Sequence, residues 1–549
     1  PSAFLGDARR ASARGPGAPP GAPPEPEGAL LAAVHHALGD LRGGAVEARL
    51  GRLEDALRPS YEAMPKNAHG RLDHATARYA MHRLFVNRHG WFVLGLEPGG
   101  GAWSSGSPAG ILHDRLPDRV QEIFERRLGD HGLDLSEVAV LAAVIENLVQ
   151  EEAVERLRHT YKLLNRSVHD PVNLEESHEV VDMYMAGYVL GFNFSEVGSA
   201  EALSKRNRIQ EAYPTWPETV KFVRAVQAAA TPQGGELVFD NLAAVIAEVG
   251  EQYGRWQDEE CRLMKNDLMK LEDRGSGRVR LSEFYRSAVK DGNWQFSESV
   301  DYLRELGALD ESDPQNMRVL IPNYVSSPTN CVASSRYYSV CCLDECEGLF
   351  SHLEQSIGAP EATQEQIAEL VAALPSATAP ANRTLSAGLV RKLDEIAQHH
   401  GNMIPLHGRL FKQWMHVAYP RECSFPHVTG TTSPQRAVDW MATTGQEIAA
   451  TTEEMAQHME TSPRHARGRG AGLEESCGLW TMEEELVSVH VGASEHGVRT
   501  SLRPALRGLL FAAAAASASL AALRSCWAAL GGDPGGDGKA PPEPARFHL

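Results

Sequence analysis

The stretch Leu263–Tyr285, LMKNDLMKLEDRGSGRVRLSEFY, gives the strongest indication of the fold. Met264, Leu268 and Leu271 recur at a spacing of three to four residues, which predicts one apolar face of a helix. Gly277 follows where the chain must turn sharply, and glycine adopts such turns freely. The stretch therefore predicts a helix–loop–helix unit.

The loop of this unit resembles the calcium-binding loop of an EF-hand. With Glu272 as loop position 1, Gly277 falls at position 6, where EF-hands have an invariant glycine. Val279 falls at position 8, the apolar residue that pairs with a partner loop. Glu283 falls at position 12, where EF-hands place a bidentate carboxylate. This resemblance implies an EF-hand-like fold.

The side chains of the loop match calcium chemistry poorly. Calcium prefers oxygen ligands at positions 1, 3, 5 and 12, together with the backbone carbonyl at position 7. Position 3 is a cationic arginine and position 5 is a serine, which is a weak ligand. We therefore expect weak or vestigial Ca²⁺ binding by Glu272, Arg274, Ser276, Arg278 and Glu283. An unrelated helix–turn–helix with a glycine turn remains the alternative.

Two diverged copies of the unit support the first interpretation. The run RVRLSEFY recurs 40 residues later as RVLIPNYV (Arg318–Val325), with Asp310 as loop position 1. A third copy, ELVFDNL (Glu236–Leu242), lies 42 residues upstream, and Gly235 aligns with Gly277. Self-similarity at a fixed period indicates a repeated supersecondary unit. We expect Val279 to pair with Val319, and the three copies to pack edge to edge.

The overall composition indicates a globular protein with an acidic surface. The chain has 549 residues, of which 42% are hydrophobic and 23% charged, and its net charge is −19. This length predicts about three or four domains. Because phosphate binding needs clustered Lys and Arg, the charge argues against nucleic acid as a partner.

A C-terminal segment has the composition of a membrane anchor. Residues 508–523 carry no charge, and the segment reaches spanning length at Leu530 if Arg524 extends to the interface. We predict a single-pass transmembrane helix at residues 505–530. A buried or surface Ala-rich helix is the alternative.

Five of the eight cysteines gather in two neighbouring parts of the chain, and their chemistry depends on the compartment. In an oxidising compartment they form disulfides, and in a reducing one they are thiols or zinc ligands. The pattern favours disulfides. Three glycosylation sequons, at Asn165, Asn193 and Asn382, are compatible with a secretory route. The clustered cysteines are Cys331, Cys341, Cys342, Cys346 and Cys423.

The fold class is therefore mostly α, with little regular strand. Asp439–Met459 predicts a late helix. Helical spacing of apolar residues in the N-terminal part predicts helices at Ala29–Leu57, Leu72–Arg88, Asp118–Leu128, Ser136–Leu164 and Leu174–Leu190. The predicted organisation is a disordered Pro/Gly-rich segment (1–28), a multi-helical domain (29–214), a degenerate paired EF-hand-like module (215–326), a Cys-containing helical region (327–434), a helix and basic linker (435–504), the anchor (505–530) and a disordered tail (531–549).

Catalytic signatures are sparse. The sequence contains no phosphate-binding loop, dinucleotide fingerprint, nucleophile elbow or His-Glu-x-x-His motif. A single Glu-x-x-His, Glu175 to His178, lies on a predicted helix, whereas di-iron bundles need two such motifs. We do not expect an enzyme, although a metal-dependent site in the N-terminal helical domain remains an alternative.

The order of these parts resembles a group of membrane-anchored, EF-hand-like proteins of protist algae that has no assigned activity. The resemblance spans Arg58 to Pro426 and rests on GSGRVRLSEFY, NCVASSRYYSVCCLDECEGLF and IPLHGRLFKQWMHVAYPREC. It implies a non-catalytic, membrane-anchored scaffold or binding protein with weak calcium binding and an unidentified protein partner. The alternative is a disulfide-stabilised lumenal or secreted structural protein.

Overall fold

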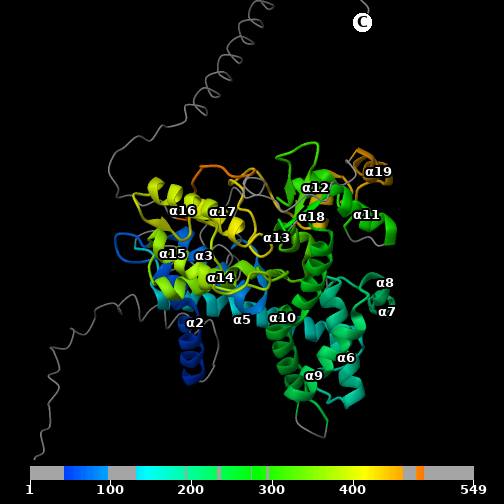
Figure 1. The fold of residues 1–549 in the computed structure, drawn as a ribbon. Helices are drawn as coiled ribbons and strands as arrows, with labels where there is room; N and C mark the ends of the chain where they lie inside the picture. Colours follow the sequence, from blue (N-terminus) through cyan, green and yellow to red (C-terminus); the bar gives the residue numbers. More distant parts are fainter. Residues whose placement is uncertain are drawn as a thin grey trace, which may run out of the picture. The chain divides into compact units, whose positions relative to one another are not determined.

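Helices dominate the structure, which confirms the mostly α class (Figure 1). All the described residues belong to one compact unit that ends at Val489. The predicted anchor and the tail lie outside the described residues. The computed structural model describes residues 43–96, 131–191, 194–231, 236–273, 275–291, 296–461 and 478–487.

The largest apolar core is formed by the N-terminal helices and the first half of the longest helix, α10 (Phe239–Leu271). The predicted helices at residues 72–88, 136–164 and 174–190 are confirmed to within two residues. The described part of the one predicted at 29–57 continues to Ala63, and the one at 118–128 lies outside the described residues. The other helices of this part are α2 (Gly43–Ala63), α3 (His74–His89), α5 (Leu135–Leu163), α6 (Leu174–Val189), α7 (Ser199–Asn207), α8 (Ile209–Ala212) and α9 (Trp216–Ala230).

Three pairs of backbone segments follow one rule. In each pair, two residues form an antiparallel bridge, and each residue lies two positions before the first residue of a helix. The bridge joins backbone groups that a short extended segment alone would leave unpaired. The structure is therefore built from paired loop–helix units. The pairs are Leu72 with Leu133, Val172 with Leu237, and Val279 with Val319.

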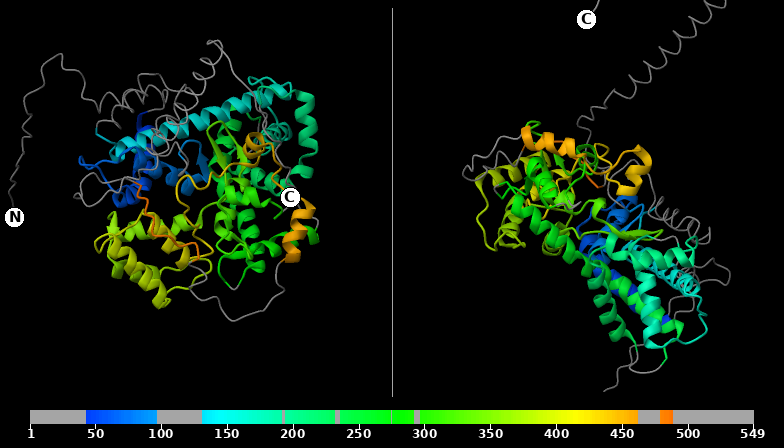
Figure 2. Two further views of the ribbon diagram at one scale, coloured as in Figure 1. Left: turned by 90° about the horizontal axis from the view of Figure 1, so that it is seen from above. Right: turned by 90° about the vertical axis from the view of Figure 1, so that its right-hand side faces the viewer.

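Two long helices connect consecutive pairs. Helix α5 has 29 residues; it begins beside Leu133 in the first pair and leads to Val172 in the second. Helix α10 has 33 residues; it begins beside Leu237 in the second pair and leads to Val279 in the third. Both are visible in Figure 2, α5 in cyan and α10 in green. Each of these long helices therefore links two pairs.

The predicted pairing of Val279 with Val319 is confirmed, but the expected arrangement of the third copy is wrong. Strand β2 (Arg278–Arg280) pairs with β4 (Arg318–Leu320), and β3 (Leu309–Asp310) completes this sheet. Leu237, in the third copy, bridges to Val172 instead. The 33 residues of α10 separate the two sites.

A second apolar core surrounds this sheet and includes the end of α10. The predicted helix Asp439–Met459 is wrong as a single element, because Gly445 adopts φ +70° and ends α18 (Ala437–Thr444). Helix α19 (Thr452–Thr461) starts afresh. The remaining helices here are α11 (Leu281–Asp291), α12 (Val300–Glu305) and α13 (Ile321–Val325).

A third core lies in the Cys-containing region and places Trp414 at its centre, fully buried. This region joins the N-terminal helices through a sheet, because β1 (Trp91–Val93) pairs with β6 (Tyr338–Val340). Its other elements are η2 (Pro328–Asn330), β5 (Val332–Ser334), α14 (Glu345–Ile357), β7 (Glu361–Ala362), α15 (Gln364–Ala373), α16 (Ala387–His399), β8 (Ile404–Pro405) and α17 (Arg409–Ala418).

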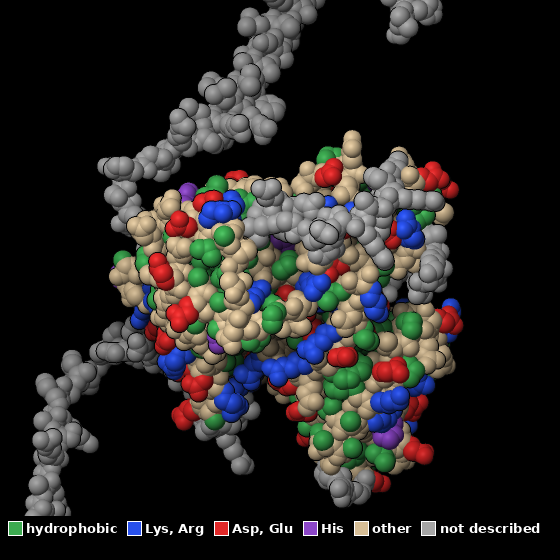
Figure 3. All heavy atoms as spheres, in the orientation of Figure 1, with side chains coloured by type: hydrophobic (Ala, Val, Ile, Leu, Met, Phe, Trp, Pro, Cys, Tyr) green, Lys and Arg blue, Asp and Glu red, His purple; other side chains and the backbone are tan. Residues whose placement is uncertain are grey.

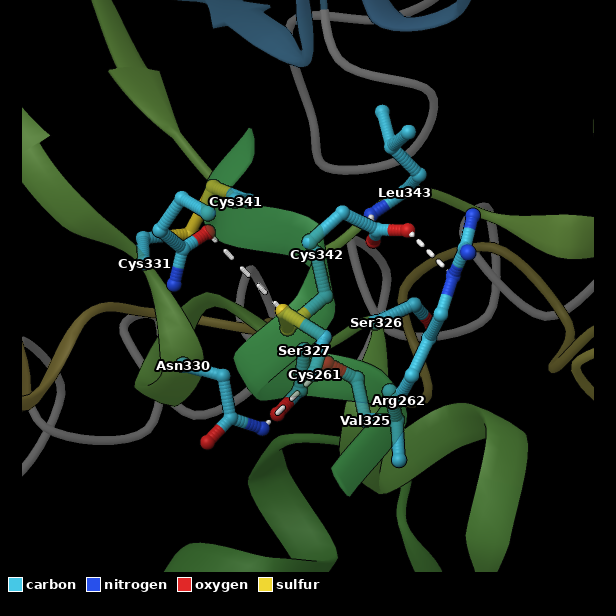
Figure 4. The surroundings of a disulfide bond; sticks show 12 residues. Cys261, Arg262, Val325, Ser326, Ser327, Asn330, Cys331, Cys341, Cys342 and Leu343 are labelled. Carbon is cyan, nitrogen blue, oxygen red and sulfur yellow. Dashed lines mark hydrogen bonds and ion pairs between the residues drawn. A yellow bond between two sulfur atoms is a disulfide. The ribbon is translucent and has the colours of Figure 1, made fainter. Parts of the chain in front are cut away.

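Three disulfides connect these parts, as the cysteine pattern predicts. The neighbouring residues Cys341 and Cys342 bond to different partners, Cys331 and Cys261 (Figure 4). The Cys261–Cys342 bond ties α10 to the segment before α14 across 81 residues of sequence, and Cys346–Cys423 spans 77. Such cross-links reduce the conformational freedom of the unfolded chain.

Surface charge and helix length relate to two predictions made from composition, the acidic surface and the membrane helix. In the view of Figure 3, acidic and basic side chains are mixed, and Lys and Arg form a band between α2 and α10. On this face, basic side chains are therefore gathered in one place. Within the described ranges, no helix is both long and apolar enough to span a membrane.

Replacing Val319 should weaken the paired unit. Val319 lies in the central strand, β4, and its side chain is fully buried in the second apolar core, so Val319→Ala should lower the free energy of unfolding by about 2 kcal/mol. Val438→Ala, at a residue that is 61% exposed, is the matched control and should change stability by less than about 0.5 kcal/mol. Urea unfolding followed by circular dichroism tests this, and equal effects of the two variants would contradict the packing.

Candidate functional site

The loop between α10 and α11 places the predicted cation ligands close together in the chain. Helix α10 ends at Leu271, and Glu272 then bridges back to Val279. Gly277 adopts φ +72°, and a Cβ atom there would lie 1.9 Å from the carbonyl oxygen of Pro420. A glycine is therefore required both for the turn and for the close approach of a distant segment.

The carboxylate of Glu272 is occupied by an arginine. The Glu272 side chain is only 3% exposed, and its Oε2 lies 2.7 Å from Nη2 and 3.0 Å from Nε of Arg421. It also accepts a hydrogen bond of 2.5 Å from the backbone N–H of Gly277. These contacts are bidentate, the strongest geometry for a guanidinium and a carboxylate. Arg421 thus contributes positive charge where loop position 1 would contact a metal.

The second copy shows the same substitution. Asp310, its loop position 1, lies 3.3 Å from Nη1 of Arg278, and both side chains are 1% exposed. Arg278 belongs to the first loop, so one loop supplies the cation that neutralises the other. The first carboxylates of both loops are therefore bound by guanidinium groups.

The other predicted ligands also have partners or lie outside the described residues. The backbone carbonyl of Arg278 accepts a hydrogen bond of 2.8 Å from the N–H of Asp273. Glu283 forms an ion pair with Arg286, one turn further along α11. Ser276 lies in the same turn, where its N–H donates to the Asp273 carbonyl. Arg274 lies outside the described residues.

The charge around the two loops disfavours a divalent cation. Among the described residues, four guanidinium groups and three carboxylates form ion pairs here, so one positive charge is in excess. Calcium sites instead concentrate several carboxylate and carbonyl oxygens around the ion. Among the described residues, no group of three or more His, Cys, Asp or Glu is arranged to hold a metal. The arginines are Arg278, Arg280, Arg318 and Arg421, and the acids are Glu272, Asp273 and Asp310.

The segment 419–427, here called the strap, lies along both loops. Asn323, which aligns with Glu283 of the first copy, donates from Nδ2 to the carbonyl of Phe425 at 2.9 Å. The N–H of Phe425 donates back to Oδ1 of Asn323 at 2.7 Å. His427 and Gly307 add a contact of 2.8 Å between Nε2 and a carbonyl. The Cys346–Cys423 disulfide fixes the strap from the other side.

Sequence reasoning missed the strap. Arg421 is 149 residues from Glu272, and neither residue signals the other. The unusual run YPRECSFPH was the one visible feature, since two prolines and a cysteine in nine residues indicate a constrained segment. Asn323 aligns with Glu283 of the first copy but binds the backbone of the strap.

Glu175 and His178, the alternative metal ligands, line a cavity in which neighbouring acids form ion pairs. A cavity of about 580 Å³ is lined by Glu175, Glu176, His178, Glu179, Asp182, Arg206 and Trp216. Three of its acids already have cationic partners: Glu176 and Glu179 contact Arg166, and Asp182 contacts Arg224. The Glu176 side chain also closes the N-terminal capping box of α6.

The whole chain has no counterpart among the proteins used for comparison: it matches no protein-family model, no curated protein and no solved structure.

Acid should destabilise the strap through His416. Burial, together with the neighbouring Arg278, lowers the pKa of this histidine to about 4, although its hydrogen bond to the Cys423 carbonyl opposes the shift. The unfolded histidine titrates near its ordinary pKa of about 6.5. Its stabilising effect is therefore complete above pH 6.5 and is lost as the pH falls toward 4.

Between those pH values the slope from this one group should approach about 1.4 kcal/mol per pH unit. We expect His416→Gln to have a shallower loss of stability between pH 6.5 and 4 than the unmodified protein. Urea unfolding at several pH values measures both slopes. Identical slopes would show that His416 does not remain neutral in the folded state.

Proposed function

We propose that this chain is a non-catalytic scaffold or binding protein whose EF-hand-like loops are neutralised by arginines of the same chain. The observation that carries the proposal is that Glu272 and Asp310, the first carboxylates of the two loops, hold Arg421 and Arg278. An internal guanidinium provides the positive charge that a metal ion provides in a calcium-dependent unit. The shape of the paired unit is thereby independent of calcium.

The proposal includes a weak or vestigial Ca²⁺ site made by Glu272, Ser276, the Arg278 carbonyl and Glu283. Arg421 is 26% exposed and joins the loop from the strap, so it is the group that calcium must displace. Arg278 is fully buried and maintains the second loop. A C-terminal membrane anchor at residues 505–530 remains part of the proposal.

Removing the competing guanidinium should strengthen calcium binding. The full-length protein should bind calcium no more tightly than about 1 mM, the weakest range of extracellular modules. Arg421→Gln should bind at least about tenfold more tightly, because it removes one positive charge next to the carboxylate of Glu272. Titration calorimetry with CaCl₂ measures both affinities.

Arg436→Gln is the matched control, since Arg436 pairs with Asp439 outside the loops. The double variant Arg421→Gln, Glu272→Gln should lose the gain. A wild-type affinity in the micromolar range would show that Arg421 does not block the loop. If folded Arg421→Gln binds no better than wild type, the loop is no cation site.

A second candidate is a secreted or lumenal structural protein, and the three disulfides favour it. Disulfides persist in oxidising compartments and are rare in the cytosol. Two of the three sequons also suit this route, because the side chains of Asn165 and Asn382 are exposed and both residues have positive φ angles in turns. Asn193 lies outside the described residues.

Alkylation distinguishes a disulfide protein from a thiol protein. Six of the eight cysteines are paired, so iodoacetamide should label at most Cys477 and Cys526 in the unfolded, unreduced chain. After reduction all eight should react. Intact mass spectrometry of protein purified from its natural source, blocked at lysis, reports the number. Six or more labels without reductant would exclude this candidate.

A further inference from the structure

Residues 478–487, GLWTMEEELV, form neither a helix nor a strand, yet they lie in defined contact with α16 and α17. Trp480 packs against the third apolar core, and Nζ of Lys392 lies 4.9 Å above its ring. An ammonium group in this position attracts the negative face of the indole. The aromatic side chain of Trp480 is thus the first contact of this segment along the sequence.

Side chains of α17 bind the backbone that follows. Gln413 is fully buried; its Nε2 donates to the carbonyl of Thr481 at 2.9 Å, and its Oε1 accepts from the N–H of Thr481 at 3.1 Å. Arg409 is 4% exposed and donates from Nη1 to the Thr481 hydroxyl at 2.9 Å and to the Glu483 carbonyl at 2.8 Å. Buried polar groups that lose such partners are costly.

Two carboxylates complete the contacts. Glu484 lies at the N-terminus of α17, where it accepts from the N–H of Leu410 at 3.1 Å and contacts Nε2 of His400 at 2.6 Å. A helix N-terminus favours negative charge, and the contact with His400 adds to that effect. Glu485 accepts from the N–H of Thr429 at 3.1 Å and from its hydroxyl at 3.0 Å.

These contacts are those of a peptide in a receptor. The receptor side chains come from α16, α17 and the turn at Thr429. They contact an aromatic ring, the backbone of one residue, a hydroxyl and two carboxylates. Recognition of linear peptides combines such backbone contacts, which give affinity, with side-chain sites, which give specificity. Trp480, Thr481, Glu484 and Glu485 each contact a different side chain or pair of side chains of the receptor.

We propose that α16, α17 and Thr429 form a recognition groove for extended acidic peptides of the pattern Trp-Thr-x-x-Glu-Glu, and that residues 480–485 are its resident ligand. A peptide of the same chemistry presented by another protein displaces the resident segment. A tethered ligand competes at an effective concentration in the millimolar range, so the groove is available only to a matching or locally concentrated partner.

The test uses the full-length protein and a fluorescein-labelled peptide with the sequence of residues 478–487. In Trp480→Ala, Glu485→Gln, the resident segment is weakened while the groove is intact. Fluorescence anisotropy should show saturable binding to this variant, at least about tenfold tighter than to the unmodified protein, because internal competition is reduced.

Matched controls establish the contacts. In the weakened background, His400→Gln should reduce peptide affinity, whereas His399→Gln should not, because among these two neighbours only His400 contacts Glu484. A peptide with Gln at the places of Glu484 and Glu485 should bind more weakly. Circular dichroism and the number of protected cysteines confirm that each variant is folded.

Absence of saturable binding to the folded, weakened variant would overturn the proposal, as would binding that is insensitive to both the His400→Gln change and the Gln-substituted peptide. Mixing the weakened variant with Gln413→Ala identifies the source of the ligand. A heterodimer in sedimentation assigns it to a second copy of this chain, and peptide binding without dimerisation assigns it to a different acidic protein. The groove shares no residue with the cation loops, so the two proposals fail independently.

Discussion

A short extended segment before a helix cannot satisfy its own backbone, and this constraint governs the fold. Each of the three bridges pairs two such segments, and in each the apolar side chain is buried while the next residues begin a helix. The pairing fixes where two helices start relative to one another. Helices α5 and α10 each begin at one pair and lead to the next. A rigid helix therefore sets the position of each pair relative to the one before it.

The arginines at the loops follow from the same requirement of satisfying buried groups. A buried carboxylate without a partner is strongly destabilising, so Glu272 and Asp310 must either bind a metal or find an internal cation. Here both find a guanidinium, which is always charged and fits a carboxylate with two hydrogen bonds. The loop can then remain folded whatever the calcium concentration, and the strap that carries Arg421 becomes part of the unit.

Local patterns predicted the elements, and distant contacts escaped them. Val279 and Val319 were identifiable because both occupy the same place in a repeated pattern, and their burial requires pairing. The third copy was placed wrongly because its partner, Val172, lies 65 residues upstream, although Val172, Leu174 and Glu176 share the spacing of Val279, Leu281 and Glu283. Arg421 was invisible because a salt bridge across 149 residues leaves no local trace. Cysteine spacing indicated disulfides. It did not indicate which cysteines pair, because six cysteines can form three bridges in many ways.

The strap and the segment 478–487 are bound by the same hydrogen-bonding arrangement. Asn323 and Gln413 each use a side-chain amide to donate to the carbonyl and accept from the N–H of a single residue, Phe425 in one case and Thr481 in the other. A primary amide is suited to this, since it carries a donor and an acceptor side by side. In both places the amide replaces the strand that would otherwise pair with the extended segment. Helices, which have no free backbone edge, can thereby hold extended chain, and the side chains of that chain are left to determine which sequence is held.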